Sequence, residues 1–245
     1  MRIMTWNING VSYWDSVKIL NPFNPAKPRY SYIRRAIEKY DPDILLLQEV
    51  IFPWDNSFVD SIGRYHIANQ KTVRSGGLAA ATKRKTAEVK YIIFEEQASL
   101  FKPKQFSDKF LRKGYQEIDL GDYLIINTHL ANSYTPEDVS DLVIQRQAEQ
   151  LLEHIRKRKN EQREIILAGD LNFRKHSALY DAFAYELEDL TASLPTTRKG
   201  YGKVDFIFAN AGNLTNCGYV EDESFKEKYP SDHPGIYVDL KPSDR

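Results

Sequence analysis

Residues 165–174, IILAGDLNFR, decide the fold class, because polar side chains follow directly after an apolar segment of strand length. Residues 165–168 are apolar, begin with two β-branched side chains and have the length of one strand. Asp170 and Asn172 follow at once, and core packing does not explain two oxygen-bearing side chains there. The stretch therefore predicts a buried strand that delivers a carboxylate and an amide to one edge of a sheet.

Other places along the chain repeat this pattern. The polar residues are Asn7 after IMTW, Glu49 after DILLLQ, His129 after IINT, Asp205 inside KVDFIF, and Asp232 with His233 in PSDHPG. One or two such residues are unremarkable, because Asn and Asp routinely form turns. Their recurrence over the whole chain predicts that several strand ends converge on one polar cleft.

The apolar runs predict a mixed α/β protein with a single domain over residues 1–245. Strands are expected at 2–6, 44–48, 77–82, 89–94, 115–120, 124–128, 165–168, 204–209 and 236–240. Apolar residues at helical spacing predict helices over 32–40 and 139–155. The second helix ends in the basic run 156–159, which we interpret mainly as a solvated helix end and secondarily as a polyanion patch.

Charge and hydropathy exclude several classes of protein. The 245 residues carry 34 Lys and Arg against 34 Asp and Glu, so any site for a polyanion is local. No apolar stretch reaches the roughly 20 residues that span a bilayer, and polar Asn7 and Asn9 stand where a signal peptide has its apolar core. Cys217 is the only cysteine, which excludes an internal disulfide and favours a cytoplasmic location. We expect a monomer and infer no protein partner.

The candidate polar residues are suited to one kind of metal chemistry. Carboxylate and amide oxygens favour Mg²⁺ or Mn²⁺, whereas the absence of a thiolate cluster and the few imidazoles disfavour zinc. Hydrolysis of a phosphate ester needs a cation at the phosphoryl oxygen, a carboxylate that positions water, and donors for the developing charge. The residue set therefore indicates phosphoester hydrolysis.

Six motifs in order give the chain a resemblance to a known family. They are TWNING at 5–10, LLLQEV at 45–50, NTHLAN at 127–132, AGDLNFR at 168–174, KVDFIFA at 203–209 and SDHPGIYV at 231–238. With these motifs the chain resembles the endonuclease/exonuclease/phosphatase superfamily from end to end. The resemblance implies a four-layer α/β sandwich, in which two mostly antiparallel β-sheets pack face to face and are flanked by helices.

The resemblance also implies a metal site. Glu49 would be the principal ligand of Mg²⁺ or Mn²⁺, with Asn7 beside it and Asp232 completing the acidic region. The ordinary alternatives are a turn for Asn7 and a surface ion pair for Glu49.

The catalytic groups are implied in the same way. Asp170 would position or deprotonate the attacking water, and Asn172 would hold the phosphate or that water. His233 would contact the scissile phosphate as an acid, a base or a stabiliser of charge, while Asp205 orients its ring and raises its pKa. The alternatives are a turn cap for the first two and pairing of Asp205 with Lys203. Whether Asp170 or His233 is the general base stays open at this point.

Three further residues bear on the substrate. The THL form around His129 resembles the deoxyribonuclease I, sphingomyelinase and tyrosyl-DNA phosphodiesterase branches, where a histidine donates to the phosphate, whereas AP endonucleases usually have a tyrosine there. Arg174 is expected either to steady a phosphate or to form a structural ion pair. Trp54, in the segment after Glu49, is a candidate for stacking on a substrate.

The predicted function is Mg²⁺-dependent hydrolysis of a phosphodiester substrate, most simply nucleic acid or a nucleic-acid adduct. Residues 101–113, FKPKQFSDKFLRK, combine five basic residues with three phenylalanines, a pattern typical of stacking on bases and tracking phosphates. An amphipathic helix is the other interpretation of this stretch. The alternative functions are phospholipid hydrolysis of the sphingomyelinase type, inositol-phosphate hydrolysis, and a catalytically silent binding module with the same fold.

Overall fold

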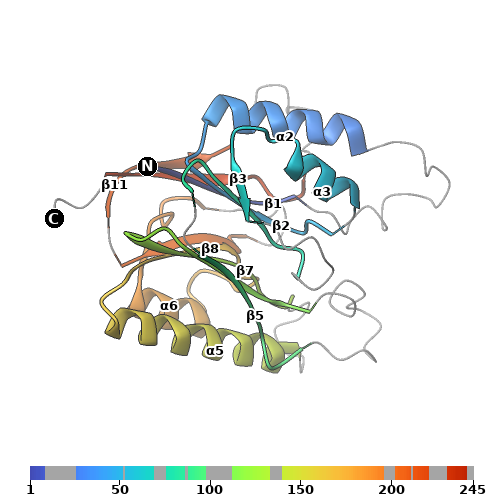
Figure 1. The fold of residues 1–245 in the computed structure, drawn as a ribbon. Coiled ribbons are helices and arrows are strands. Elements are labelled where there is room, and N and C mark those ends of the chain that lie inside the picture. Colours follow the sequence, from blue (N-terminus) through green and yellow to red (C-terminus); the bar gives the residue numbers. More distant parts are fainter. Residues whose placement is uncertain are drawn as a thin grey trace.

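Two six-stranded sheets pack face to face, with helices on both outer faces, in the computed structural model (Figure 1). The structure describes residues 1–8, 26–51, 53–68, 76–85, 88–97, 112–132, 140–195, 202–210, 212–220 and 231–241. The predicted four-layer α/β sandwich is confirmed.

The first sheet has helices α2 (Ala26–Tyr40) and α3 (Pro53–Asp60) on its outer side. Its strands, in spatial order, are β11 (Asn213–Tyr219), β12 (Ile236–Lys241), β1 (Arg2–Asn7), β2 (Ile44–Gln48), β4 (Ala79–Thr82) and β3 (His66–Ala68). The second sheet has helices α5 (Ser140–Asn160) and α6 (Ala178–Glu186) on its outer side. Its strands are β5 (Glu88–Ile93), β6 (Gly114–Asp119), β7 (Tyr123–His129), β8 (Glu164–Asp170), β10 (Asp205–Ala209) and β9 (Glu188–Asp189).

Both sheets are mostly antiparallel, as predicted, and each has one parallel pair near its middle. The parallel pairs are β1 with β2 and β7 with β8. Because parallel strands run in the same direction, their carboxyl ends meet at one edge of the sheet. Asn7, Glu49, His129 and Asp170 all lie at or directly after such ends.

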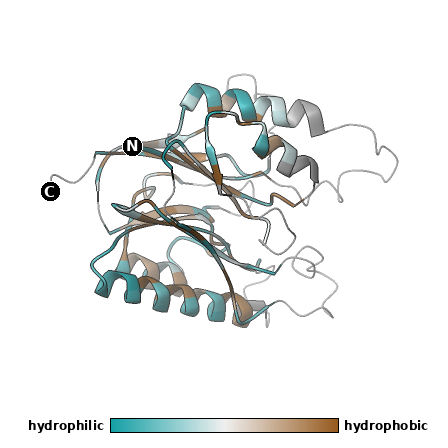
Figure 2. Cartoon of the chain, in the orientation of Figure 1, coloured by the Kyte–Doolittle hydropathy of each residue, from teal (hydrophilic) through white to brown (hydrophobic). Residues whose placement is uncertain are grey.

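The central strands are apolar on both faces, because both faces are covered. Along β2, Ile44 and Leu46 pack between the two sheets, while Leu45 and Leu47 pack toward the outer helices with Ile37 of α2. A strand buried on both faces gives a continuous apolar run instead of an alternating one. Figure 2 shows the same distribution, with hydrophobic colour along the strands and hydrophilic colour on the outer sides of the helices.

All of the predicted strands and both predicted helices have counterparts, but five of the elements that the structure describes were not predicted. Strands β3, β9 and β11 and helices α3 and α6 were not predicted. β9 has two residues and β3 has three, and β11 is an edge strand whose first four residues are exposed. None of these strands presents the apolar run on which the prediction of strands depended.

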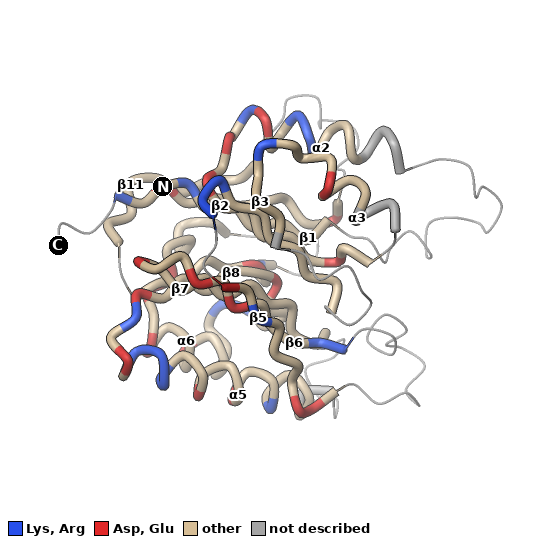
Figure 3. The backbone as a smooth tube through the Cα atoms, in the orientation of Figure 1, with Lys and Arg blue, Asp and Glu red and all other residues tan. Residues whose placement is uncertain are grey.

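The basic run at the end of α5 is largely neutralised by ion pairs. Arg156 and Lys159 each contact Glu186 at 2.7 Å, and Arg158 contacts Glu117 at the same distance. Figure 3 shows acidic residues interspersed with the basic ones in this region. The run is therefore part of the packing between α5, α6 and the second sheet, and the interpretation as a polyanion patch loses its support.

None of the helices that the structure describes is long and apolar enough to cross a membrane. The longest of them, α5, has a charged last turn that contains Lys157, Arg158 and Lys159. The cytoplasmic location and the monomeric state stay predictions.

Replacement of Gly169 by alanine is expected to destabilise the fold by about 2 kcal/mol or more. The φ of Gly169 is 143°, and a Cβ atom there would overlap the carbonyl oxygen of Thr128 on the neighbouring strand. Denaturant unfolding of Gly169→Ala measures the effect. Gly121→Ala is the control, because Gly121 also has a positive φ of 86° but no atom near its Cβ position. Equal losses in the two variants would contradict the steric argument.

Candidate active site

Strand register places three of the predicted residues side by side in the second sheet. Asp170 on β8 pairs with His129 on the parallel strand β7 and with Asp205 on the antiparallel strand β10. Paired residues in adjacent strands project to the same face of a sheet. All three are buried, and His129 Nε2 lies 3.6 Å from Asp170 Oδ2.

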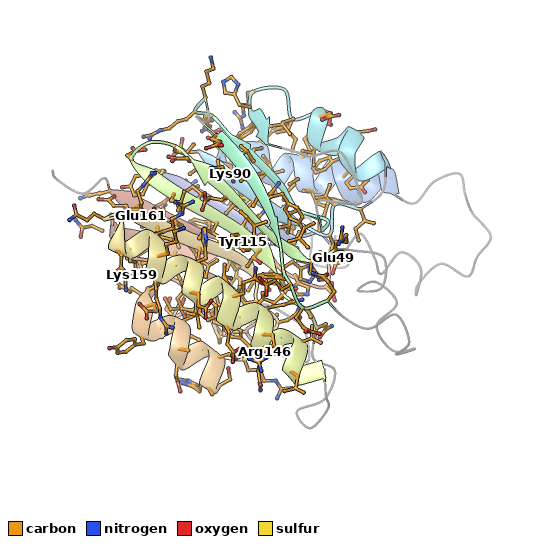
Figure 4. The ribbon with its side chains drawn as sticks, turned by 60° about the horizontal axis from the view of Figure 1, so that its bottom comes forward. Glu49, Lys90, Tyr115, Arg146, Lys159 and Glu161 are labelled. Atoms are coloured by element: carbon orange, nitrogen blue, oxygen red, sulfur yellow. The ribbon has the colours of Figure 1, made fainter. Side chains whose placement is uncertain are left out.

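Asn7 and Glu49 of the first sheet lie next to these three residues of the second sheet. Asn7 pairs with Gln48 in the register of β1 and β2, and Glu49 follows directly after β2. The Asn7 amide nitrogen donates to Glu49 Oε1 at 3.1 Å and to Asp170 Oδ2 at 2.9 Å. Asn7 therefore joins the two sheets at the site. Figure 4 shows Glu49 far from Lys159 and Glu161, which mark the other end of the sandwich.

Two site residues have a left-handed backbone conformation that non-glycine residues rarely adopt. Glu49 has φ 59° and Asn172 has φ 51°. Such strain persists only where the surroundings hold it, and it concentrates at functional sites. Two hydrogen bonds hold Asn172 in this conformation. Its backbone N–H donates to Asp170 Oδ1 at 3.1 Å, and its side-chain amide donates to the Leu130 carbonyl at 2.9 Å.

His233 enters the site from the loop before β12 and contacts two of the acids. Its Nδ1 lies 2.8 Å from Asp205 Oδ2, and its Nε2 lies 3.8 Å from Asp170 Oδ2. Asp205 thus contacts the imidazole ring, as predicted. The alternative pairing with Lys203 is wrong, since Lys203 Nζ lies 2.9 Å from Asp189 Oδ2.

Burial and mutual charge shift the pKa values of this pair. Burial, reinforced by the negative charge of Asp205, raises the pKa of Asp170 to about 6. Burial alone would lower the pKa of His233, but the charges of Asp205 and Asp170 outweigh it and raise that pKa to about 10. The two acids therefore favour the protonated form of the His233 imidazole.

The donor set of the site fits a hard divalent cation. Glu49 is half-buried beside Asn7, and the exposed Asp232 has Oδ2 4.0 Å from His233 Nε2. Asp170, Asp205 and His233 also form a group whose ligand atoms lie within 4.8 Å of one another, but a protonated His233 cannot ligate a cation. The oxygens of Glu49, Asn7 and Asp232 are therefore the donors that suit Mg²⁺ or Mn²⁺.

The structure describes only some of the residues that were predicted to bind the substrate. Arg174, two residues after Asn172, is exposed and forms no ion pair with another described residue, so the structural ion pair gains no support. Trp54 falls in α3, but its side chain is outside the described residues, as is the stretch 101–111. Lys113, which we grouped with that stretch, is instead 2% exposed and belongs to the site's wall. Its assignment to a backbone-tracking surface is wrong.

Several residues of the site were not predicted. Ser231 donates to the Asn7 carbonyl at 2.6 Å and accepts from the His233 backbone, and Trp6 Nε1 donates to the His233 carbonyl at 2.8 Å. Trp6 lies within the motif at 5–10 and Ser231 begins the motif at 231–238, so membership of these motifs was the available signal.

A buried amide network behind the site also escaped the sequence analysis. Gln48 Nε2 on the first sheet donates to Asn127 Oδ1 on the second at 2.8 Å, and Asn127 Nδ2 donates to Gln116 Oε1 at 3.0 Å. The network ties the two sheets together directly behind Glu49 and His129. Gln48 lies in the motif at 45–50 and Asn127 in the motif at 127–132, but neither was assigned a role.

The chain belongs to the Endonuclease/Exonuclease/phosphatase family, whose sequence profile matches residues 4–233. Members of this family are metal-dependent phosphoric ester hydrolases, and the chain is an enzyme of that class. No curated protein matches the chain significantly.

Solved structures share the fold at low sequence identity. Mannosyl-6-phosphatase from Bacteroides thetaiotaomicron aligns with a TM-score of 0.72 and 18% identity, covering 98% of this chain and 99% of that one. Sphingomyelinase C from Streptomyces griseocarneus gives 0.67 and 16%, covering 97% and 98%. D. rerio TDP2 in complex with a single-strand DNA product gives 0.66 and 17%, covering 98% of each chain. At these identities the likeness shows the fold alone.

Proposed function

We propose that this enzyme hydrolyses phosphodiester bonds by Mg²⁺-assisted attack of an activated water. The observation that carries the proposal is the contact of Asn7 with both Glu49 and Asp170, because it unites the predicted metal residues with the predicted water-activating group. His233 and Asp205 complete the set on the other side of Asp170.

Glu49, Asn7 and Asp232 would hold the cation. When bound, it supplies positive charge to a phosphoryl oxygen and lowers the pKa of nearby water. Glu49 fits the role of principal ligand, because its carboxylate is half-buried while the other acids of the site are either buried or exposed.

Asp170 would accept the proton of the attacking water, and His233 would stabilise the charge that develops on the phosphate. The pKa values support this division, since His233 keeps its proton at neutral pH while Asp170, with a pKa near 6, is largely ionised. Asp205 holds the ring of His233 through Nδ1, so that Nε2 is directed toward Asp170. Asn172 and His129 would donate to the phosphate or to the water.

Nucleic acid, or a nucleic-acid adduct, is the substrate class we favour. The basic and aromatic composition of residues 101–113 supports it, as does the fold shared with a protein solved with a single-strand DNA product. The neighbours named for sphingomyelin and a sugar phosphate keep phospholipid and phosphomonoester substrates as alternatives.

A panel of substrates tests the proposal. Single-stranded and duplex DNA, RNA, a 5′-tyrosyl oligonucleotide, sphingomyelin, an inositol polyphosphate and mannose 6-phosphate are offered with Mg²⁺ or Mn²⁺. We expect the highest kcat/KM on an oligonucleotide or its adduct. A preference for sphingomyelin or for a phosphomonoester would overturn the substrate class, and no turnover on any of them would overturn the proposed reaction.

Neutralising the basic stretch is expected to weaken oligonucleotide binding and flatten its salt dependence. If the basic residues Lys102, Lys104, Lys109 and Arg112 contact phosphates, their replacement by alanine removes up to about three units from the slope of log K against log salt, at about 0.7 per contact for single strands. Affinity measured between low and moderate salt gives the slope. Equal slopes in the variant and the wild type would remove this stretch from the binding site.

A further inference from the structure

Lys113 stands at a closely constrained point of the backbone, directly before β6. The side chain of Gln97 brackets it, since Gln97 Oε1 accepts from the Lys113 backbone N–H at 2.9 Å and Gln97 Nε2 donates to the Lys113 backbone carbonyl at 2.9 Å. The N–H of Phe94 donates to the same carbonyl at 3.0 Å. A Cβ atom on the following residue, Gly114, would overlap the Ile92 carbonyl, so the chain passes here without room to shift.

The side chain of Lys113 leads from this point into the active site. It is 2% exposed, and its Nζ donates to the Leu130 carbonyl at 3.3 Å. The same carbonyl accepts from the Asn172 side chain at 2.9 Å, and the Leu130 N–H donates to the Asp170 carbonyl at 3.0 Å. Lys113 and Asn172 therefore converge on one backbone group beside Asp170.

The positive charge of Lys113 acts on the carboxyl group of Asp170. Its positive charge is one of the influences that lower the pKa of Asp170, against the larger effect of burial. A buried ammonium is costly unless negative charge faces it. The buried Lys203 has a different environment, since its Nζ lies 2.9 Å from Asp189 Oδ2 and 4.6 Å from the centre of the Phe206 ring. Lys113 is placed among reacting groups instead.

We propose that Lys113 is a further catalytic residue, whose ammonium contacts a non-bridging oxygen of the substrate phosphate and stabilises the charge that develops there. This inference rests on the proposed function and adds a fixed cation to its site. Lysine is a flexible point charge that binds phosphate well, and a donor aimed at developing charge typically contributes about 10²–10³ in rate.

The test compares Lys113→Met, Lys113→Gln and Lys113→Arg with the wild type. The exposed Lys90 supplies a control, Lys90→Met, that removes the same charge on β5. We expect kcat/KM for bis(p-nitrophenyl) phosphate, a substrate too small to need an extended groove, to fall about 100-fold in the Met and Gln variants. Lys113→Arg should recover part of the loss, and Lys90→Met should stay close to the wild type.

Binding of inorganic phosphate to the metal-free protein gives a readout that does not need turnover. Affinity is expected to fall about tenfold or more in Lys113→Met and Lys113→Gln and to stay nearly unchanged in Lys90→Met. In the wild type, the Nζ NMR signal of Lys113, assigned by its disappearance in Lys113→Arg, should shift when phosphate is added. That measurement holds even where the Met and Gln variants do not fold.

The outcomes separate the two proposals. An active wild type whose Lys113 signal ignores phosphate, or folded variants that keep both rate and phosphate affinity, would overturn the role of Lys113 and leave the proposed reaction standing. A wild type inactive on the whole panel would overturn the reaction, while the phosphate titration would still decide whether Lys113 binds the anion.

Discussion

Replacement of Asp170 by asparagine, or of His233 by alanine, is expected to lower kcat by about 10²–10⁴. Asp170 lies at the centre of the site, with Asn7 at 2.9 Å, His129 at 3.6 Å and His233 at 3.8 Å. Asparagine keeps the shape of the side chain but cannot accept a proton from water. Alanine at His233 removes the imidazolium that Asp205 orients. Steady-state kinetics on the best substrate of the panel measures both losses.

The turnover of the variant protein that remains folded decides between a catalytic and a structural role. If Asp170 and His233 are catalytic groups, the folded variants should lose activity, although loss of the buried contact with Asp205 also lowers the stability of His233→Ala. As a turn cap and a structural histidine, they would lose about 1 kcal/mol of stability and keep most of their turnover. Because groups that act together are not additive, the double variant should be little worse than the poorer single one. Folded single variants with near-normal turnover would refute the assignment of these two residues as catalytic groups.

The same pair predicts the pH profile. The pKa of Asp170 is raised to about 6, so below that pH the carboxyl carries a proton and cannot take one from water. The rate should therefore fall as the pH drops through this range, and a bound cation, which favours the ionised form, moves the fall to lower pH. His233, with a pKa near 10, stays charged across neutral pH. A rate that rises as the pH drops from 7 to 5 would contradict Asp170 as the base.

Replacement of Glu49 by glutamine is expected to weaken Mg²⁺ activation strongly, and complete chelation by EDTA should abolish turnover. The amide keeps the size of the side chain and a carbonyl oxygen near Asn7, but it removes the negative charge that a hard cation needs. The Mg²⁺ concentration for half-maximal activity should rise by about tenfold or more, since one full ligand charge is lost. Titration of activity and of metal binding by calorimetry gives the two values.

Glu161→Gln is the matched control for this variant, because it removes the same charge at the other end of the sandwich (Figure 4). It should leave the Mg²⁺ dependence unaltered. Both variants should fold, since neither charge lies in the apolar core. Turnover that continues unchanged after complete chelation would overturn the metal assignment, and equal metal affinity in Glu49→Gln and the wild type would remove Glu49 from the ligand set.

The sequence was sufficient for the parts of the fold that depend on local pattern. The apolar run of β2 predicted a strand because both faces of that strand are buried, and the same holds for β8. Strand β11 escaped prediction because it lies at an edge, where exposure removes the need for apolar residues. Helix α6 escaped because it is short and is capped by Ser177, a residue as typical of turns as of helix starts.

By itself, the sequence determined which residue types stand behind the central strands, and hence the class of chemistry at their ends. Only the tertiary structure decided which of them meet. The pairing of Asp170 with both His129 and Asp205 follows from the register of three strands, which depends on contacts more than 30 residues apart. The tertiary structure also decided between His233 and Lys203 as the partner of Asp205, in favour of His233. It placed Lys113, which belongs to a basic stretch of the sequence, in the buried interior. A side chain's neighbours depend on the packing of distant segments, and no local pattern encodes that packing.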